Sequence, residues 1–221
     1  GTRLSRTFGR FPFLFVLGVL GTDVVAAYAI GRRVMLLALM PAWGYSTAAS
    51  TLVGQAVGGG DDAEATEYGW QTLRIALVTQ LLIAAVIFLA AEPLAQVFGA
   101  GNVALTTTFI RVFGLGVAGF SVSRTMRGAL RGAGDTRWPF YGGLLGTYVV
   151  RLPVAFAALP VGFAVSAFGV TVAPGLGWAL PAVYAAILAD MYARAVVNGA
   201  RYYSGEWLRV ARESNVGSAA D

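Results

Sequence analysis

The sequence contains no histidine and no cysteine, and all of its 16 basic residues are arginine. Without histidine there is no Ser-His-Asp relay and no imidazole metal ligand. Without cysteine there is no thiolate nucleophile, no zinc–thiolate or iron–sulfur site, and no disulfide bond. Most familiar catalytic centres are therefore excluded, and we expect a protein that is not an enzyme and holds no metal or organic cofactor.

Charge is scarce as well. Only 12% of the 221 residues are charged and 57% are hydrophobic, whereas a soluble domain carries roughly 25% charged residues. The chain has too few polar groups to cover a soluble globule, so the lipid bilayer is the first solvent to consider. The net charge of +5 does not indicate a nucleic-acid partner, because the arginines are spaced between apolar runs and are not clustered among aromatics.

Long apolar stretches fill most of the chain. A membrane-spanning helix needs about 20 mainly apolar residues, and the sequence predicts an all-α integral membrane protein whose six-transmembrane-helix bundle occupies residues 1–200. Residues 152–189 carry no acidic or basic side chain and are too long for one span, so we expect the turn-rich residues 171–177 to divide them. The predicted spans cover residues 8–22, 25–57, 71–91, 103–123, 138–162 and 176–197.

The arginines predict the orientation. Most of them, with both chain ends, fall on one predicted face of the membrane, whereas Arg32 and Arg33 fall on the other. The positive-inside rule makes the arginine-rich face cytoplasmic, and we expect a multi-pass protein of the cell (plasma) membrane. Residues 201–221 are predicted to be a cytoplasmic tail, either interfacial at headgroup depth or solvated, and disordered from residue 214.

Glycines recur at spacings that favour close helix packing or helix ends. Two loops, residues 54–64 and 127–139, each combine a helix end, a glycine stop and an aspartate that caps the next helix, namely Asp61 or Asp62 in the first and Asp135 in the second. The GxxxG spacing, which lets two helix backbones approach closely, occurs at Gly54/Gly58, Gly128/Gly132 and Gly142/Gly146.

Residues 20–32, 40–58 and 130–139, with the shorter stretches 151–153 and 203–207, carry a resemblance that covers nearly the whole chain in the right order. The sequence resembles the C-terminal lobe of the multidrug and toxic compound extrusion (MATE) family of antiporters. The resemblance implies one lobe of a two-lobe, twelve-helix transporter, whose N-terminal lobe is absent from this chain.

The same resemblance implies secondary active efflux of organic cations or other xenobiotics, driven by entry of Na⁺ or H⁺, with alternating access between the lobes. Its expected partners are the lipid bilayer, the small-molecule substrate and the N-terminal lobe. Some family members bind the coupling ion through carboxylates in the seventh and tenth helices. The corresponding regions here carry Arg3, Arg6, Arg10 and Arg111, so we expect the coupling-ion site to lie in the N-terminal lobe.

Three ionisable residues fall inside predicted spans: Asp190, Arg151 and Arg111. A charge in hydrocarbon costs roughly 2.5 to 3.5 kcal/mol, so each calls for a partner or a role. Asp190 has Arg194 four positions on, at helix-neighbour spacing, and either a neutralising pair or a pathway role fits it. Arg151 directly precedes Leu152-Pro153, where it could satisfy a freed carbonyl or pair with an interior acid. Arg111 lies near an outer helix end and could snorkel outward.

Gln55, Tyr141 and Tyr148 complete the candidate substrate or ion pathway, because they are polar groups on helices that could face the interior of the lobe. Tyrosines in such a cavity could stack on flat organic cations, but they are also ordinary residues of the aromatic belt at a membrane surface.

Three other functions stay open at this point. A lipid-linked oligosaccharide flippase of related architecture would need a strongly cationic cavity, which Arg111 and Arg151 keep in view. An integral-membrane enzyme would need converging polar groups that the sequence hardly offers. A non-transporting membrane scaffold would need none of the pathway residues.

Overall fold

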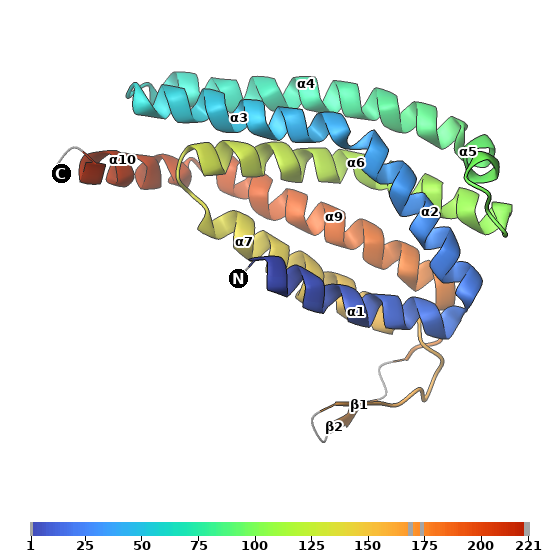
Figure 1. The fold of residues 1–221 in the computed structure, drawn as a ribbon. Coiled ribbons are helices and arrows are strands. Elements are labelled where there is room, and N and C mark those ends of the chain that lie inside the picture. Colours follow the sequence, from blue (N-terminus) through green and yellow to red (C-terminus); the bar gives the residue numbers. More distant parts are fainter. Residues whose placement is uncertain (1, 168–169, 173–174, 219–221) are drawn as a thin grey trace. The chain divides into compact units, whose positions relative to one another are not determined.

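The computed structural model describes residues 2–167, 170–172 and 175–218, and its elements are almost all helices (Figure 1). In chain order they are α1 Thr2–Leu20, α2 Thr22–Ala38, α3 Met40–Gly58, α4 Asp62–Leu89, α5 Ala91–Val97, α6 Val103–Gly132, α7 Arg137–Leu144, the π-helix η1 Leu145–Arg151, α8 Leu152–Phe156, the strands β1 Val165–Ala167 and β2 Val170–Val172, α9 Ala179–Tyr203 and α10 Glu206–Ser218. The expectation of an all-α membrane fold is confirmed, with the small β1–β2 hairpin as its one departure among the described residues.

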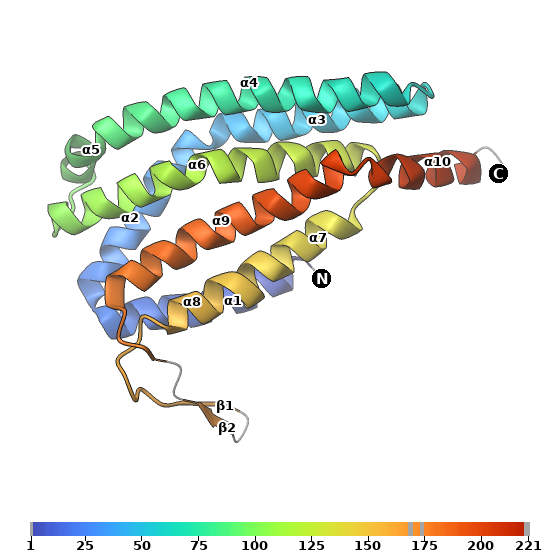
Figure 2. The ribbon, with the colours of Figure 1, turned by 180° about the vertical axis from the view of Figure 1, so that it is seen from behind.

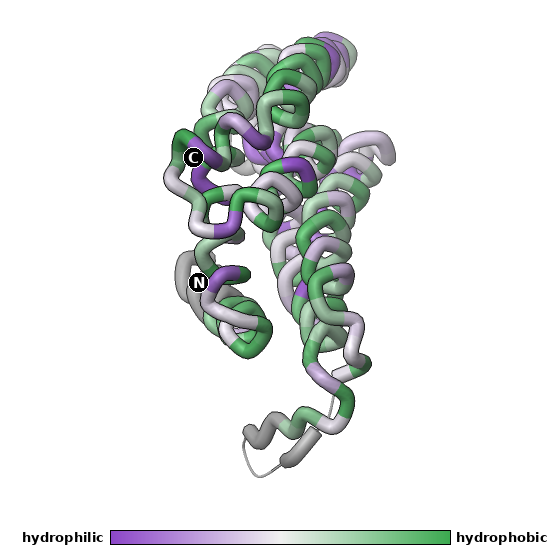
Figure 3. Tube along the Cα trace, turned by 90° about the vertical axis from the view of Figure 1, so that its right-hand side faces the viewer, coloured by the Kyte–Doolittle hydropathy of each residue, from purple (hydrophilic) through white to green (hydrophobic). Residues whose placement is uncertain are grey.

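Hydrophobic residues run along most of the helices (Figure 3). Within the described part of the chain, three helices, α4, α6 and α9, are each long and apolar enough to cross a membrane, and α2 with α3 makes a fourth if this pair, bent by 45°, is one span. The predicted spans 8–22 and 138–162 fall on α1 and on the helical run α7–η1–α8. That these two segments also cross the membrane stays a prediction.

The segment between α8 and α9 differs from the prediction. The fifth span was expected to reach residue 162, but α8 ends at Phe156, and residues 165–172 contain two strands that pair antiparallel, Val165 opposite Val172 and Ala167 opposite Val170. Strands rich in valine and threonine suit a pleated backbone better than a helix. The expected break at 171–177 therefore lies partly in β2, and its residues 173–174 lie outside the described residues.

The C-terminal tail is also more ordered than predicted. Helix α9 continues to Tyr203, and α10 follows at Glu206–Ser218. The indole of Trp207 is fully buried and stacks on the ring of Tyr202, with centroids 4.9 Å apart and planes within 9°. This aromatic anchor ties α10 to the end of α9, and residues 214–218, which were expected to be disordered, are the end of a helix. The position of the tail at headgroup depth or in solvent stays a prediction. Residues 219–221 lie outside the described residues.

The chain forms two compact units, each built from pieces of several helices. Unit 1 comprises Gly1–Met35, Val86–Gly116 and Leu144–Asp190, and unit 2 comprises Leu36–Ala85, Val117–Gly143 and Met191–Asp221. In unit 1, α1 packs along η1 and α8 (Figure 2). In unit 2, α3 and α4 lie side by side in both ribbon views (Figures 1 and 2).

Glycines bring α3 and α6 into backbone contact within unit 2. A Cβ added to Gly128 would lie 2.8 Å from the carbonyl carbon of Ser46, and one added to Gly132 would lie 2.9 Å from that of Ser50, each still closer to the oxygen. A Cβ on Gly54 would lie 3.1 Å from the oxygen of Gly132. Close packing at these three glycines is confirmed, since a Cβ at Gly128 or Gly132 would collide with the backbone of α3 and one at Gly54 would be tight against the backbone of α6.

Two other glycines of these pairs can be compared with the GxxxG prediction, which stays a prediction for the sixth, Gly146. Gly142 of α7 packs against Val197 of α9, whose Cγ1 would lie 3.2 Å from an added Cβ. Gly58 has open space around it, so the packing expectation is wrong at this position. It lies in the last turn of α3, where the chain turns away toward α4.

The two glycine-rich loops end their helices in the same way. Gly60 and Gly134 both have positive φ, at 79° and 84°, and the next residue bonds back five positions: Asp61 N–H to Ala56 O at 3.0 Å, Asp135 N–H to Leu130 O at 2.8 Å. This is the Schellman motif, in which a left-handed glycine satisfies the last helix carbonyls. Asp61 Oδ1 then accepts the Glu64 N–H at 2.8 Å, which confirms it as the N-cap of α4.

Candidate functional site: a buried arginine–aspartate pair

Arg151 is placed by an irregular stretch of helix. The run from α7 to α8 changes to π-helical bonding over η1, and the N–H of Leu152 donates to the carbonyl of Thr147, five residues back. Pro153 has no N–H to offer the carbonyl of Val149, four residues back, so a regular α-helix cannot continue through this point. Such π segments widen a helix and occur frequently at functional sites.

The guanidinium of Arg151 meets three different groups within unit 1. Its Nη1 lies 3.9 Å from Oδ2 of Asp190, its Nη2 donates a hydrogen bond to the hydroxyl of Tyr28 at 3.0 Å, and its Cζ lies 3.9 Å from the ring centroid of Phe13. The side chains of Arg151 and Asp190 are 18% and 12% exposed. The arginine thus has a carboxylate, a phenol and an aromatic face around it, which are the partners that a desolvated cation needs.

Aromatic rings surround this pair. The ring of Tyr28 on α2 has three aromatic neighbours, at centroid distances of 5.4 Å to Phe13, 6.0 Å to Phe109 and 5.7 Å to Phe113. Gly31, three residues after Tyr28, lets α2 approach α6, because a Cβ there would lie 3.0 Å from Cβ of Phe109. The aromatic groups hold the phenol in place and keep the dielectric low around the charges, which strengthens their attraction.

The pair lies deep along its helices. Asp190 follows the first residue of α9 by eleven positions and precedes the last by thirteen, which is about 16 and 20 Å of helix at about 1.5 Å per residue. Nε of Arg151 is buried and finds no acceptor in the part of the chain that the structure describes. An interior charge pair on a candidate spanning helix is the kind of feature that marks a functional site in a membrane protein.

The structure brings together two of the six candidate pathway residues, Arg151 and Asp190. This answers the question left open for Arg151, which pairs with an interior acid. The additional pairing of Asp190 with Arg194 stays a prediction. Arg111 lies apart from the pair: it is exposed on α6, and its guanidinium lies 5.6 Å from the ring centroid of Phe88, which fits the expectation that it reaches outward.

The remaining candidates are exposed. Tyr148 lies on η1 in unit 1 and is 37% exposed, and Tyr141 lies on α7 in unit 2 and is 51% exposed. Gln55 is exposed on α3, also in unit 2. A role for these three in a substrate pathway stays a prediction.

Sequence reasoning missed Tyr28 and Phe13. Tyr28 lies inside one of the stretches that carry the family resemblance, but nothing in the sequence separates it from the other tyrosines. Only the fold places its hydroxyl beside Arg151, which is 123 residues away in the chain. A contact between a buried phenol and an interior arginine can be recognised only in the three-dimensional structure.

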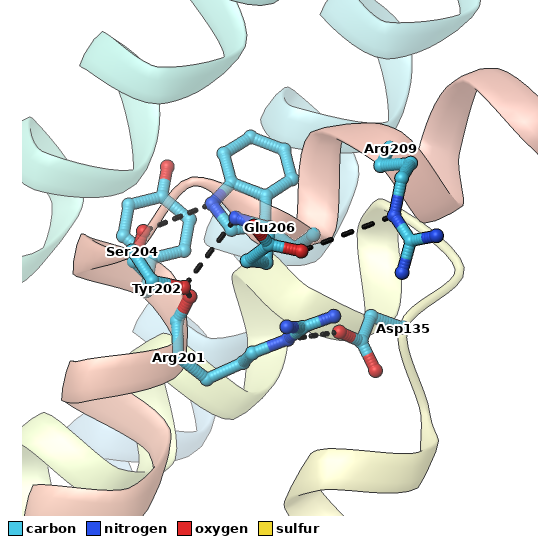
Figure 4. A network of polar contacts seen from close by, with 7 residues as sticks. Asp135, Arg201, Tyr202, Ser204, Glu206 and Arg209 are labelled. Atoms are coloured by element: carbon cyan, nitrogen blue, oxygen red, sulfur yellow. Dashed lines mark hydrogen bonds and ion pairs between the residues drawn. The ribbon is translucent and has the colours of Figure 1, made fainter.

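A second polar centre lies in unit 2, where the α6–α7 connection meets the end of α9 (Figure 4). Oδ2 of Asp135 accepts a hydrogen bond from Nε of Arg201 at 2.8 Å, and the two side chains are 3% and 11% exposed. The guanidinium of Arg201 also lies 5.2 Å from the ring centroid of Trp138. The prediction that a local helix cap accounts for Asp135 is therefore incomplete, because its carboxylate forms a buried ion pair with a distant arginine.

Tyr202, next to Arg201, ties α9 to α4 and α10. Its hydroxyl donates to the carbonyls of Ala65 and Thr66, both at 3.1 Å, and its own carbonyl accepts the indole N–H of Trp207 at 3.0 Å. Gly69 makes room for the phenol, since a Cβ there would lie 2.4 Å or less from its Cζ and hydroxyl. Asp62 is the first residue of α4 and not its cap, which is Asp61. Its Oδ2 accepts a hydrogen bond from Nε of Arg212 at 2.8 Å.

Comparisons with known proteins agree with this architecture. A solved structure described as the outward-facing conformation of a multidrug resistance MATE family transporter of the MOP superfamily superposes with a TM-score of 0.74 at 17% identity, covering 92% of this chain and 44% of that one. That coverage is what one lobe of a two-lobe protein gives, and the expected fold is confirmed.

Curated relatives match about two thirds of the chain. The probable multidrug resistance protein NorM of Thermotoga maritima is 33% identical over 150 residues, which are 67% of this chain and 32% of that protein. Multidrug and toxin extrusion protein 1 of Homo sapiens is 24% identical over 147 residues, 66% of this chain and 26% of that protein. The chain therefore spans about a third of the length of these relatives.

The family model MatE matches residues 2–157, well over half of the 221 residues. The match includes α1 to α8, and so three of the four residues of the buried cluster, Phe13, Tyr28 and Arg151. On this match, the chain belongs to the MatE family of multidrug efflux transporters.

Proposed function

We propose that this chain is the C-terminal lobe of a secondary active efflux transporter, which exports organic cations or other xenobiotics in exchange for Na⁺ or H⁺. The family match supports the transport function, and the relatives are named as multidrug resistance and extrusion proteins, not as enzymes. In this proposal the substrate passes between this lobe and an N-terminal lobe of the same protein, in a multi-pass cell-membrane protein whose chain ends are cytoplasmic.

The mechanism that we propose for this lobe depends on one observation, the Arg151–Asp190 pair. A coupling cation needs a carboxylate whose charge is not already balanced, and the carboxylate of Asp190 faces the guanidinium of Arg151 at 3.9 Å. We therefore place the coupling-ion site in the N-terminal lobe and assign Arg151 and Asp190 a positioning role. With Tyr28, the pair links η1, α9 and α2, so unit 1 moves as one body during alternating access.

The geometry does not favour a lipid-linked oligosaccharide flippase. Such a cavity would present uncompensated positive charge to a pyrophosphate group. Of the two arginines that kept this function in view, Arg151 is balanced by Asp190 and covered by Phe13. The other, Arg111, is exposed on α6 beside the ring of Phe88.

The test is efflux of a fluorescent organic cation such as ethidium from vesicles that contain the complete protein. We expect efflux to depend on an imposed Na⁺ or H⁺ gradient and to stop when an ionophore collapses the coupled one. Efflux that persists when both gradients are collapsed would contradict antiport. A protein that moves no ethidium but translocates lipid-linked sugar would be a flippase.

A matched pair of variants separates transport from a scaffold role. Asp190→Asn removes the buried negative charge, and Glu92→Gln removes one from an exposed acid on α5. We expect efflux to fall at least several-fold in the first variant and to stay near the wild-type rate in the second. A scaffold would show no gradient-dependent efflux in any of the three proteins.

The orientation in the membrane can be tested by cysteine labelling, because this chain contains no cysteine of its own that would react with the label. A cysteine introduced at exposed Gly101, in the α5–α6 connection, should react with a membrane-impermeant maleimide added outside the cell. One introduced at exposed Gly59, in the α3–α4 connection, should react only after the membrane is opened. The reverse pattern would place the chain ends outside.

A further inference from the structure

The joint between α2 and α3 breaks the regular ladder of helix hydrogen bonds. Pro41 has no N–H, so it leaves the carbonyl of Leu37 without its usual helix partner. The N–H of Ala42 donates to the carbonyl of Leu39, three residues back, at 3.1 Å. The carbonyl of Ala38, four residues before Ala42, is therefore released from the ladder at the point where the two helices bend by 45°.

Gln80 of α4 supplies hydrogen-bond partners at this break in the helix. Its side chain is completely buried. With the amide oriented to satisfy its surroundings, its nitrogen donates to the carbonyl of Ala38 at 3.2 Å and its oxygen accepts from the N–H of Ala42 at 3.0 Å. These are the two groups that would bond each other if the helix were continuous. One side-chain amide is thus inserted between the donor and the acceptor of a single missing helix bond.

We propose that Gln80 is the positioning residue of this joint and holds the bend open by occupying the broken rung of the ladder. If α2 and α3 straightened, Ala42 N–H could bond Ala38 O directly, and both ends of the buried amide would lose their partners. If the bend remained without Gln80, the Ala38 carbonyl would be left unpaired in an apolar setting. A buried polar group without a partner is costly, so the amide and the bend stabilise each other.

A side chain inserted into the i→i−4 ladder is a recognised cause of a helix kink. Here the inserted group comes from a neighbouring helix, so the angle between α2 and α3 depends on where α4 presents Gln80. A hydrogen bond close to Gln80 provides a built-in control: the hydroxyl of Tyr45 donates to Oγ1 of Thr79 at 2.9 Å. That bond also joins α3 to α4, but it does not enter the ladder.

The test is a distance across the joint in the complete protein, held in lipid nanodiscs and measured by pulsed EPR between spin labels on cysteines introduced at Ala26 of α2 and Thr51 of α3. Both positions are exposed. At about 1.5 Å per residue, the 25-residue separation spans about 38 Å along a straight helix. A 45° bend at Leu39 shortens it to about 35 Å by the same rise.

Gln80→Leu keeps the volume of the side chain, but leucine cannot form hydrogen bonds with the carbonyl of Ala38 or the N–H of Ala42. We expect the mean label distance to lengthen toward that of the straight helix, by up to about 3 Å from the same geometry, since Pro41 still excludes one bond of the ladder. Gln80→Glu should keep the wild-type distance, because a buried carboxylic acid stays protonated and can donate to Ala38 and accept from Ala42. Thr79→Val removes the neighbouring bond from Tyr45 and the bond from the Thr79 hydroxyl to the carbonyl of Ile75. Neither bond enters the broken rung, so this variant should also keep the wild-type distance.

A wild-type distance in Gln80→Leu, or an equal lengthening in Thr79→Val, would overturn the proposal. If Gln80→Leu does not give a monodisperse protein, Gln80→Asn carries the same test, because its amide is one methylene too short to reach both groups and should also lengthen the distance. The readout is a distance and needs no substrate or ion gradient. A failure of the proposed antiport would therefore leave this result intact, and a failure here would leave antiport untouched.

Discussion

The Arg151–Asp190 pair gives the sharpest test of how unit 1 is held together. Arg151→Met removes the cation and leaves a carboxylate in a largely buried site, whereas Asp190→Asn removes the anion and leaves the guanidinium between Phe13 and Tyr28. The double variant removes both charges. If the two charges depend on each other, each single change should harm the protein more than the double change does.

The magnitude follows from the separation of the charged groups. Two unit charges 3.9 Å apart attract by about 4 kcal/mol at an effective dielectric constant of about 20. Removing one member of a buried pair typically costs about 3–5 kcal/mol, while removing both can be close to neutral. The shift is about 2–4 °C per kcal/mol for 150–250 residues and smaller for a longer protein. We therefore expect each single variant to lower the apparent melting temperature of the complete protein by up to about 10 °C and the double variant by much less.

The assay is thermal unfolding of the detergent-solubilised complete protein, followed by loss of the monodisperse peak in size-exclusion chromatography. Arg111→Met is the matched control, because it makes the same substitution at an exposed arginine and should change the melting temperature by only a few degrees. The coupling would be refuted if the double variant lost as much melting temperature as the two single variants together. It would also be refuted if the melting temperature of Arg111→Met fell as far as that of Arg151→Met.

Two further predictions, each a contrast between two variants, use the same assay. Gly132→Ala should cost about 1–3 kcal/mol as an overpacked contact, because its Cβ would lie 2.9 Å from a carbonyl carbon of α3. Gly44→Ala, with nothing within 4 Å, should hold or raise stability through helix propensity, by up to about 1 kcal/mol. Asp135→Asn should cost about 3 kcal/mol by leaving a buried guanidinium without its counter-charge. Arg212→Ala should cost less than about 1 kcal/mol, because its pair is largely exposed.

Each of these contrasts has an outcome that contradicts it. Equal melting temperatures for Gly132→Ala and Gly44→Ala would mean that α3 and α6 can separate freely. A larger loss of stability in Arg212→Ala than in Asp135→Asn would mean that burial does not decide which of these two ion pairs contributes more to stability.

Much of the helical framework could be predicted from composition alone. The six apolar stretches coincide with α1, α2–α3, α4, α6, α7–η1–α8 and α9, because a run of apolar residues without charge has few alternatives to a helix in a membrane. The glycine stops after α3 and α6 were also predictable, since the left-handed conformation at a helix end favours glycine. The β1–β2 hairpin and α10 were not, because short strands and a helix fixed by one buried indole depend on distant contacts.

The candidate site was only half predictable. An arginine and an aspartate inside apolar stretches stand out in the sequence because their charge is costly there, which is why Arg151 and Asp190 were identified. Their pairing was one of several options, and the phenol and the ring beside them carried no signal. Burial that brings together residues far apart in the chain leaves no mark on local sequence.

The scarcity of charge and the long apolar runs predicted a helical protein of the bilayer, and the absence of histidine and cysteine removed most of the usual catalytic groups. Those properties depend on composition and on runs of neighbouring residues, which the sequence displays directly. Only the tertiary structure decided that Arg151 meets Asp190 and Tyr28, that Asp135 meets Arg201, and that Gln80 occupies a broken helix bond. Each of these contacts joins residues far apart in the chain, and their geometry exists only after the helices have packed.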